Sequence, residues 1–248
     1  MALREDMENQ GNWLFKWRSY LPLLVIPLFI IALRQAKLFE HILGDKATDY
    51  WETLSICVSF LGLGVRCITV GYVPRGTSGR NTKSQLAESL NMTGMYSIIR
   101  NPLYMGNFII VLGITLFIQV WWFALMVWVG FWLYYERIIF SEEEFLRKKF
   151  GASFIDWTKK TPILFPNFKN WKKPELLFSL KTVIRREFST FFSIVAVFFF
   201  LEVSTNLLLK GKLEVRMSWV YFFIIGLIIY LICLILKKKT KLLNVSGR

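Results

Sequence analysis

The sequence predicts an all-α, polytopic integral membrane protein with five to six transmembrane helices. Two observations predict this fold class: 54% of the 248 residues are hydrophobic and 17% are aromatic, and the mean hydropathy is +0.44. A soluble domain of this size would rarely tolerate so apolar a composition. Little chain lies outside the apolar stretches, so residues 1–248 are expected to form a single membrane domain.

Six apolar stretches are candidate membrane spans. They are Tyr20 to Leu33, Thr53 to Val73, Leu103 to Gln119, Trp121 to Phe140, Phe188 to Leu209, and Met217 to Leu236. The first stretch is short and contains Pro22 and Pro27, so a tilted, kinked or re-entrant segment is an alternative to a complete span. Four or five complete spans therefore remain an alternative to six.

The third and fourth stretches form one apolar hairpin, because no charged residue occurs from Leu103 to Tyr135. A helix of 17 residues spans about 25 Å, so a tight turn near Gln119 and Val120 returns the chain to the face it left. The hairpin should therefore bring two polar segments together at one membrane surface. These segments are residues 94–106 before the hairpin and residues 142–146 after it.

The distribution of cationic residues predicts the orientation of the chain. With six spans, the side that carries both polar segments has 24 Lys and Arg residues and the opposite side has 6. By the positive-inside rule the first side is cytoplasmic. The net charge of +14 is then explained by topology and by attraction to anionic lipid headgroups, so nucleic acid is not expected as a partner.

Cysteine and histidine give no indication of a metal or redox site. Cys57, Cys67 and Cys233 all fall in apolar stretches without paired spacing, which is typical of small buried side chains. His41 is the only histidine, and the chain lacks the Cys-x-x-Cys and His-Glu-x-x-His patterns. No metal is expected.

A turn-rich segment with three cations follows the second apolar stretch, from Pro74 to Lys83. Gly76 and Gly79 permit backbone conformations that expose consecutive N–H groups, which would suit a phosphate or carboxylate. A positively charged connector anchored to lipid headgroups is an equally good interpretation. The candidate substrate-binding residues in this segment are Arg75, Arg80, Asn81 and Lys83.

After the hairpin, Ser141 is predicted to cap a new helix, with Glu144 three residues further on. Residues 142–157 alternate charged and apolar side chains at helical spacing, which indicates a helix lying at the membrane interface.

The two polar segments together match a family pattern. The pattern is Gly94, then Arg100-Asn101-Pro102-x-Tyr104-x-Gly106, then Glu142-Glu143-x-x-Leu146-x-x-x-Phe150-Gly151, Trp157, Pro162 and Pro166. It resembles the isoprenylcysteine carboxyl methyltransferase and phospholipid methyltransferase superfamily. The resemblance places a family core at about residues 53–170 and leaves an additional transmembrane pair at residues 188–236.

The resemblance implies a cofactor pocket on the cytoplasmic face that binds S-adenosylmethionine, with a lipid substrate arriving from the membrane. The implied cofactor-binding residues are Gly94, Tyr96, Arg100, Asn101, Pro102, Tyr104, Gly106, Glu142 and Glu143, and the implied catalytic residues are Arg100, Glu142 and Glu143. Arg100 near a helix amino terminus would hold the cofactor carboxylate, and either glutamate would take its ammonium or ribose hydroxyls. Tyr104 would lie beside the sulfonium. Taken singly, each residue also has a structural interpretation: Arg100 as a membrane-edge anchor, Tyr104 as part of an aromatic belt, and the glutamates as a helix cap.

The chain departs from the family pattern at three places. Asn101 stands where the family usually has histidine, and Phe154 stands where it usually has tyrosine. The third departure is the additional pair, in which Glu202 should face protein because a carboxylate is costly in lipid. Arg66 in the second span is its expected partner.

The lost histidine favours an acceptor that is already anionic, because an asparagine cannot remove a proton near neutral pH. The cation-rich segment from Arg75 to Lys83 suits a phosphate better than one small carboxylate. Together with Thr93-Gly94, this segment also resembles a bacterial branch of the family proposed to methylate the phosphate of lipid A, which implies O-methylation of a lipid phosphate at the inner membrane. The alternatives are an isoprenylcysteine carboxyl O-methyltransferase, an NADPH-dependent enzyme resembling the membrane sterol reductases, and a non-enzymatic lipid-binding scaffold.

Overall fold

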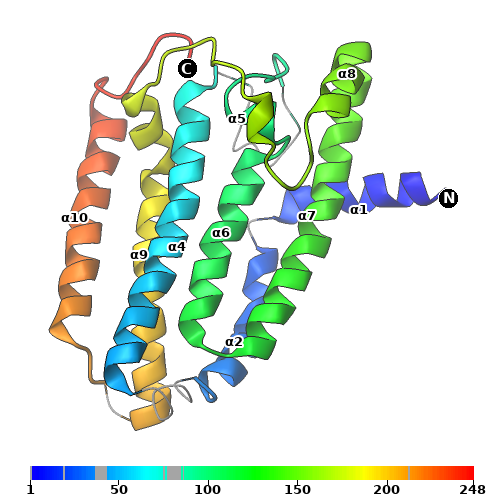
Figure 1. The fold of residues 1–248 in the computed structure, drawn as a ribbon. Coiled ribbons are helices and arrows are strands. Elements are labelled where there is room, and N and C mark those ends of the chain that lie inside the picture. The colour runs from blue at the N-terminus through cyan, green and yellow to red at the C-terminus, as the bar shows by residue number, and fades with distance from the viewer. Residues whose placement is uncertain are drawn as a thin grey trace.

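The fold is a bundle of long helices that run side by side, and some of the short elements lie at one end of it (Figure 1). It was analysed in a computed structural model, which describes residues 2–18, 20–36, 44–74, 76, 85, 87–211 and 213–248. No strand occurs in these ranges. The helices are α1 (Leu3–Trp17), η1 (Leu21–Val25), α2 (Ile26–Leu33), α4 (Asp45–Tyr72), α5 (Met95–Ile98), α6 (Pro102–Ile118), α7 (Trp121–Phe150), α8 (Ala152–Lys160), η2 (Phe168–Asn170), α9 (Leu180–Lys210) and α10 (Met217–Lys239).

Four of these helices, α4, α7, α9 and α10, are long and apolar enough to cross a membrane, and α2 and α6 are shorter apolar helices. The all-α membrane class is therefore confirmed. The predicted hairpin is also confirmed: Pro102 is the first residue of α6, and Gln119 ends that helix in the left-handed conformation with φ of 62°. Trp121 then begins α7.

Helix α4 packs closely against α6, and the reason is the small residues on both helices. A Cβ on Gly62 would lie 2.6 Å from the carbonyl oxygen of Gly106, and a Cβ on Gly113 would lie 2.4 Å from that of Ser55. Ser59 donates a hydrogen bond of 2.9 Å to the carbonyl oxygen of Ile110 across the same contact. The backbones can approach only because these side chains are absent or small.

The additional C-terminal pair completes the bundle: α9 packs against α4, and α10 packs against α9. At the end opposite α5 and α8, Arg216 binds Asp49, Glu52 and Glu202, which joins α10 to α4 and α9. The expected pairing of Glu202 with Arg66 is wrong. Glu202 and Arg66 lie toward opposite ends of the antiparallel α9 and α4, so each finds its partner at its own end.

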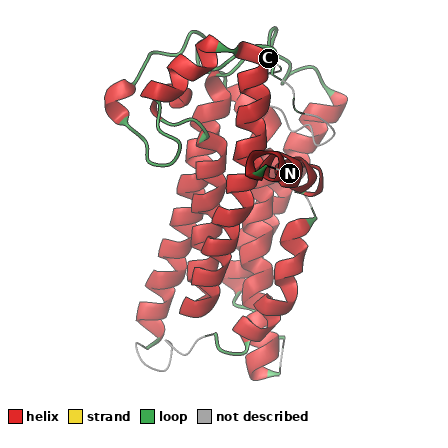
Figure 2. Ribbon diagram, turned by 90° about the vertical axis from the view of Figure 1, so that its right-hand side faces the viewer, coloured by secondary structure: helices red, strands yellow, loops and turns green. Residues whose placement is uncertain are grey.

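Helix α1 lies across the bundle rather than along it, and Figure 2 shows it almost end-on. It packs against α7, where a Cβ on Gly11 would lie only 2.2 Å from the carbonyl oxygen of Arg137. Two ion pairs of 2.5 Å connect the helices, Arg4 with Glu144 and Glu8 with Lys148. No pattern in the sequence predicted this docked helix.

The predicted helix start at Ser141 is wrong, because α7 continues without a break to Phe150. The Ser141 hydroxyl instead donates to the carbonyl oxygen of Ile138, within the same helix. The break comes at Gly151, with φ of 53°, and α8 begins directly after it. The amphipathic stretch is thus divided between the end of α7 and α8.

Candidate functional site

The two polar segments meet at one end of the hairpin, as predicted. Tyr104 on α6 donates a hydrogen bond of 2.7 Å to Oε1 of Glu142 on α7. Arg100, just before α6, lies with Nη1 3.1 Å from Oε1 of Glu143. The rigid hairpin therefore holds side chains 38 and 43 residues apart in direct contact.

Arg100 uses its other donors to hold the end of α8. Its Nη2 donates to the carbonyl oxygen of Thr158 and its Nε to that of Thr161, each at 2.7 Å. Carbonyl groups at a helix carboxyl terminus lack partners within the helix and carry partial negative charge. Arg100 therefore ties α8 to α7 and to the start of α6, as a positioning residue.

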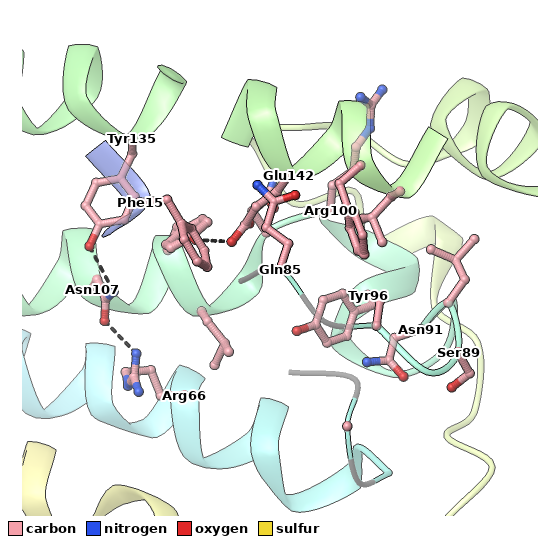
Figure 3. Close-up of a pocket in the computed structure, with 18 of the residues that line it drawn as sticks. Phe15, Arg66, Gln85, Ser89, Asn91, Tyr96, Arg100, Asn107, Tyr135 and Glu142 are labelled. Carbon is pink, nitrogen blue, oxygen red and sulfur yellow. Dashed lines mark hydrogen bonds between the residues drawn. The ribbon is translucent and has the colours of Figure 1, made fainter. Parts of the chain in front are cut away.

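A cavity of about 420 Å³ lies beside these contacts (Figure 3). The predicted cofactor-binding residues that line it are Tyr96, Arg100, Asn101, Tyr104 and Glu142. The structure does not bring Gly94, Pro102, Gly106 or Glu143 to its wall.

Gly94 and Gly106 have local structural reasons for being glycine. Gly94 adopts a φ of 57°, in the left-handed region, and its N–H donates to the carbonyl oxygen of Lys172. A Cβ on Gly106 would lie 2.6 Å from Cγ of Arg66. Gly106 thus makes room for Arg66 beside the cavity.

Asn101 presents a donor that lacks a protein partner. Its Nδ2 is buried and has no hydrogen-bond partner among the residues that the structure describes. Because an unsatisfied buried donor is costly, this atom fits an acceptor group on a bound ligand. Asn101 directly precedes the amino terminus of α6, where the helix dipole also favours an anionic group.

Tyr96 on α5 is fixed against α8, since Nε1 of Trp157 donates to the Tyr96 carbonyl oxygen at 3.0 Å. Burial raises the pKa of the Tyr96 phenol, and the nearby Arg186 partly opposes this effect. The Tyr96 hydroxyl is consequently a neutral group at physiological pH.

The cavity also contains residues that sequence reasoning missed. Their common feature is that their positions in the sequence lie outside residues 94–106 and 142–146: Phe15, Arg18, Arg66, Asn107, Tyr135, Arg186 and Glu187. Only Arg66 gave a signal in the sequence, as a charge inside an apolar stretch.

A network joins four helices along one side of the cavity. Arg66 on α4 binds Glu187 on α9, with Nε 2.8 Å from Oε2 and Nη2 2.9 Å from Oε1. Its Nη1 donates to Oδ1 of Asn107 at 2.6 Å, and Nδ2 of Asn107 donates to the Tyr135 hydroxyl at 3.3 Å. Arg66 therefore has an acidic partner, as an intramembrane charge requires, but that partner is Glu187.

The candidate substrate-binding residues Arg75, Arg80, Asn81 and Lys83 lie outside the described residues. Within the described ranges, no group of three or more His, Cys, Asp or Glu side chains is arranged to hold a metal ion.

These features define a class: a polytopic helical membrane protein with a polar, arginine-containing cavity at one end of its bundle. Residues 56–153 match the family model of the phospholipid methyltransferases, and this part of the chain is consistent with the isoprenylcysteine and phospholipid methyltransferase superfamily. The match includes the hairpin and both polar segments.

Two curated proteins are similar in sequence. The nickel-cobalt-cadmium resistance protein NccN of Alcaligenes xylosoxydans xylosoxydans is 29% identical over 47% of this chain and 54% of its own length. The cobalt-zinc-cadmium resistance protein CzcN of Cupriavidus metallidurans is 25% identical over 60% of this chain and 63% of its own length. The chain thus spans between about half and two thirds of these relatives. No solved structure matches the chain.

Proposed function

We propose that the protein transfers a methyl group from S-adenosylmethionine to an anionic oxygen of a membrane lipid. The family match supports a membrane methyltransferase that acts on a lipid. The observation that carries the proposal is the contact of Tyr104 with Glu142 beside the unpartnered Nδ2 of Asn101, on the wall of one cavity.

The cavity fits the proposed cofactor in size and chemistry. Its volume of about 420 Å³ lies within the range of about 300–1,000 Å³ that is typical of small-molecule sites. The Glu142 carboxylate would bind the ammonium group or the ribose hydroxyls, and Asn101 Nδ2 together with the amino terminus of α6 would bind the carboxylate. The ion pair of Arg100 with Glu143 would hold α7, α8 and the start of α6 in position.

The side chains of the cavity suit an acceptor that needs no general base. When bound, S-adenosylmethionine supplies a methyl group activated by a positively charged sulfur. A lone pair of the acceptor oxygen forms the new C–O bond while the C–S bond breaks, and the electron pair of that bond goes to sulfur. No proton moves, so Asn101 in place of a titratable histidine is no obstacle. Opposite charges are neutralised in this step, which a buried, partly apolar cavity favours.

Among anionic lipids we favour a lipid phosphate, such as that of lipid A, at the cytoplasmic face of the bacterial inner membrane. The cationic segment with Arg75, Arg80, Asn81 and Lys83 is proposed to contribute to its binding. The names of the two relatives refer to metal resistance. A methyl ester removes one negative charge from a phosphate and with it a ligand for divalent cations, so metal tolerance is a useful second readout of the same reaction.

Calorimetric titration of the purified protein with S-adenosylmethionine and, separately, with NADPH tests the cofactor. Tight binding of NADPH without binding of S-adenosylmethionine would favour the reductase alternative. Mass spectrometry of total lipids from cells with and without the gene then tests the acceptor. We expect a lipid heavier by one methylene, and a shift confined to prenylated peptides would favour the isoprenylcysteine alternative. No shift in any lipid or prenylated peptide would refute the proposed methyl transfer.

A further inference from the structure

The network on the cavity wall has a direction that follows from donor and acceptor chemistry. It begins at Glu187 on α9, passes through Arg66 and Asn107, and ends at Tyr135 on α7. Figure 3 shows the part from Arg66 to Tyr135. An arginine side chain carries only donors. The atom of Asn107 that faces Arg66 at 2.6 Å must therefore be the carbonyl oxygen.

This assignment fixes the other end of the Asn107 amide. Its NH₂ group faces the Tyr135 hydroxyl at 3.3 Å, and an amide NH₂ can only donate. The Tyr135 oxygen is thus an acceptor in this contact, and its own O–H must donate in another direction. Among the residues that the structure describes, the Tyr135 hydroxyl makes the hydrogen bond from Asn107 and donates to no side chain or carbonyl oxygen.

The Tyr135 ring is held firmly beside the cavity. Its centroid lies 4.6 Å from that of Tyr104 and 4.2 Å from that of Phe131. Tyr104 differs from Tyr135 in one respect, because its O–H already donates to Glu142. Among the described residues that line the cavity, Tyr135 is the tyrosine contributed by α7.

The electrostatics of the cavity favour an anionic ligand. Four arginines and two glutamates line it: Arg18, Arg66, Arg100, Arg186, Glu142 and Glu187. The positive excess acts within a partly buried space, where solvent screens charges less than at the surface. Glu142 is on α7, whereas Arg66 and Arg186 come from α4 and α9.

From these observations we infer that the Tyr135 hydroxyl binds the anionic oxygen of the methyl acceptor, in a direction set by Glu187, Arg66 and Asn107. The inference rests on the proposed function and names the acceptor side of the same site. Tyr135 selects for an acceptor oxygen that carries charge and lone pairs, and the excess of arginine over glutamate in the cavity lining supplies the favourable potential.

Three variants of the full chain test this assignment by calorimetric titration with dihexanoyl phosphatidic acid in detergent. Tyr135→Phe removes the donor and should weaken binding about tenfold, the effect of one hydrogen bond to a charged group. Asn107→Asp keeps the tyrosine but presents two acceptors, so the Tyr135 hydroxyl should turn toward the new carboxylate. We expect a loss at least as large, because the carboxylate also adds negative charge.

Tyr134→Phe is the matched control. Tyr134 is the neighbouring residue on α7, does not line the cavity, and has a buried hydroxyl without a partner among the described residues. Its variant should bind phosphatidic acid as the unmodified protein does. Equal binding by the Tyr134→Phe and Tyr135→Phe proteins would overturn the inference.

Separate titrations distinguish this inference from the proposed function. Failure of the unmodified protein to bind S-adenosylmethionine refutes the proposed function, whereas unchanged cofactor binding with unchanged phosphatidic acid binding in both test variants refutes only the role of Tyr135. S-farnesylcysteine provides a carboxylate in place of a phosphate. If Tyr135→Phe weakens its binding as well, the result supports a Tyr135 hydroxyl that binds an anionic oxygen of either group. Competition by inorganic phosphate at equal concentration would contradict a lipid ligand. Binding of neither lipid probe to the unmodified protein also overturns the inference.

Discussion

Arg66 and Glu187 form a two-point ion pair inside the helical bundle, with side chains that are 12% and 4% exposed. The pair connects α4, within the region that matches the phospholipid methyltransferase family, to α9, which lies outside it. Breaking a buried pair leaves one uncompensated charge, whereas replacing both residues with apolar ones removes the cost of burying either charge.

We therefore expect Arg66→Met and Glu187→Leu singly to destabilise the protein by about 3–5 kcal/mol each. The double variant should recover a large part of that loss. Thermal unfolding in detergent measures both effects. The exposed pair of Lys159 and Asp156, each 68% exposed, supplies the control: Asp156→Asn should change stability by less than about 1 kcal/mol. Additive single losses in the double variant would contradict this account.

The close approach of α4 and α6 predicts opposite outcomes for two glycines that are two residues apart. A Cβ on Gly62 would lie 2.6 Å from a backbone oxygen and 2.7 Å from a backbone nitrogen of α6, but a Cβ on Gly64 would meet nothing within 4 Å. Gly62→Ala should cost about 1–3 kcal/mol through overpacking. Gly64→Ala should be neutral or stabilise the helix by up to about 1 kcal/mol. Chemical denaturation compares them, and equal effects would rule out the close crossing.

The two adjacent glutamates should differ in their effect on cofactor binding. Glu142 lines the cavity, and Glu143 binds Arg100 away from its wall. Glu142→Gln should weaken S-adenosylmethionine binding by about 10- to 100-fold, because a hydrogen bond to a charged group is lost. Glu143→Gln should mainly lower the thermal stability, with a smaller loss of affinity. Calorimetry and thermal unfolding together separate the two roles. A larger loss of affinity in the Glu143→Gln protein than in the Glu142→Gln protein would contradict these assignments.

Helix α1 should leave α7 when its crossing point is filled. Gly11→Val would place side-chain atoms against the backbone of Arg137, and the ion pairs Arg4–Glu144 and Glu8–Lys148 are too exposed on one partner to compensate. Hydrogen exchange in residues 3–17 should then increase. Gln10→Ala changes an exposed neighbouring position and should leave the exchange unchanged. Protected amides in the Gly11→Val protein would contradict the docked arrangement.

The sequence predicted the hairpin and the meeting of its polar ends because both depend on local signals. Pro102 fixes the start of α6, and the absence of charge to Tyr135 requires two apolar arms. Contact of Tyr104 with Glu142 follows once those arms are antiparallel and of known length.

The partner of Arg66 could not be predicted in the same way. Burial of a charge requires a partner but does not identify it, and the choice between Glu187 and Glu202 depends on how α9 is aligned with α4. The docking of α1 depends on the fit of Gly11 to the surface of α7, which no periodicity in the sequence expresses. The alignment of helices that are distant in the sequence, and the fit between their surfaces, could not be predicted from local sequence patterns.

The alignment of α9 has a consequence for how this architecture diversifies. The hairpin carries Tyr104, Glu142 and Asn101, whereas Arg186 and Glu187 enter the same cavity from a helix that the family region does not include. Under the proposed function, the donor would be held by residues of the hairpin region, whereas the acceptor side would combine Asn107 and Tyr135 of the hairpin with residues of α9. A chimaera that exchanges α9 and α10 while retaining the hairpin should therefore keep S-adenosylmethionine binding and change the affinity for the lipid, which would make the C-terminal pair an exchangeable contributor to lipid recognition.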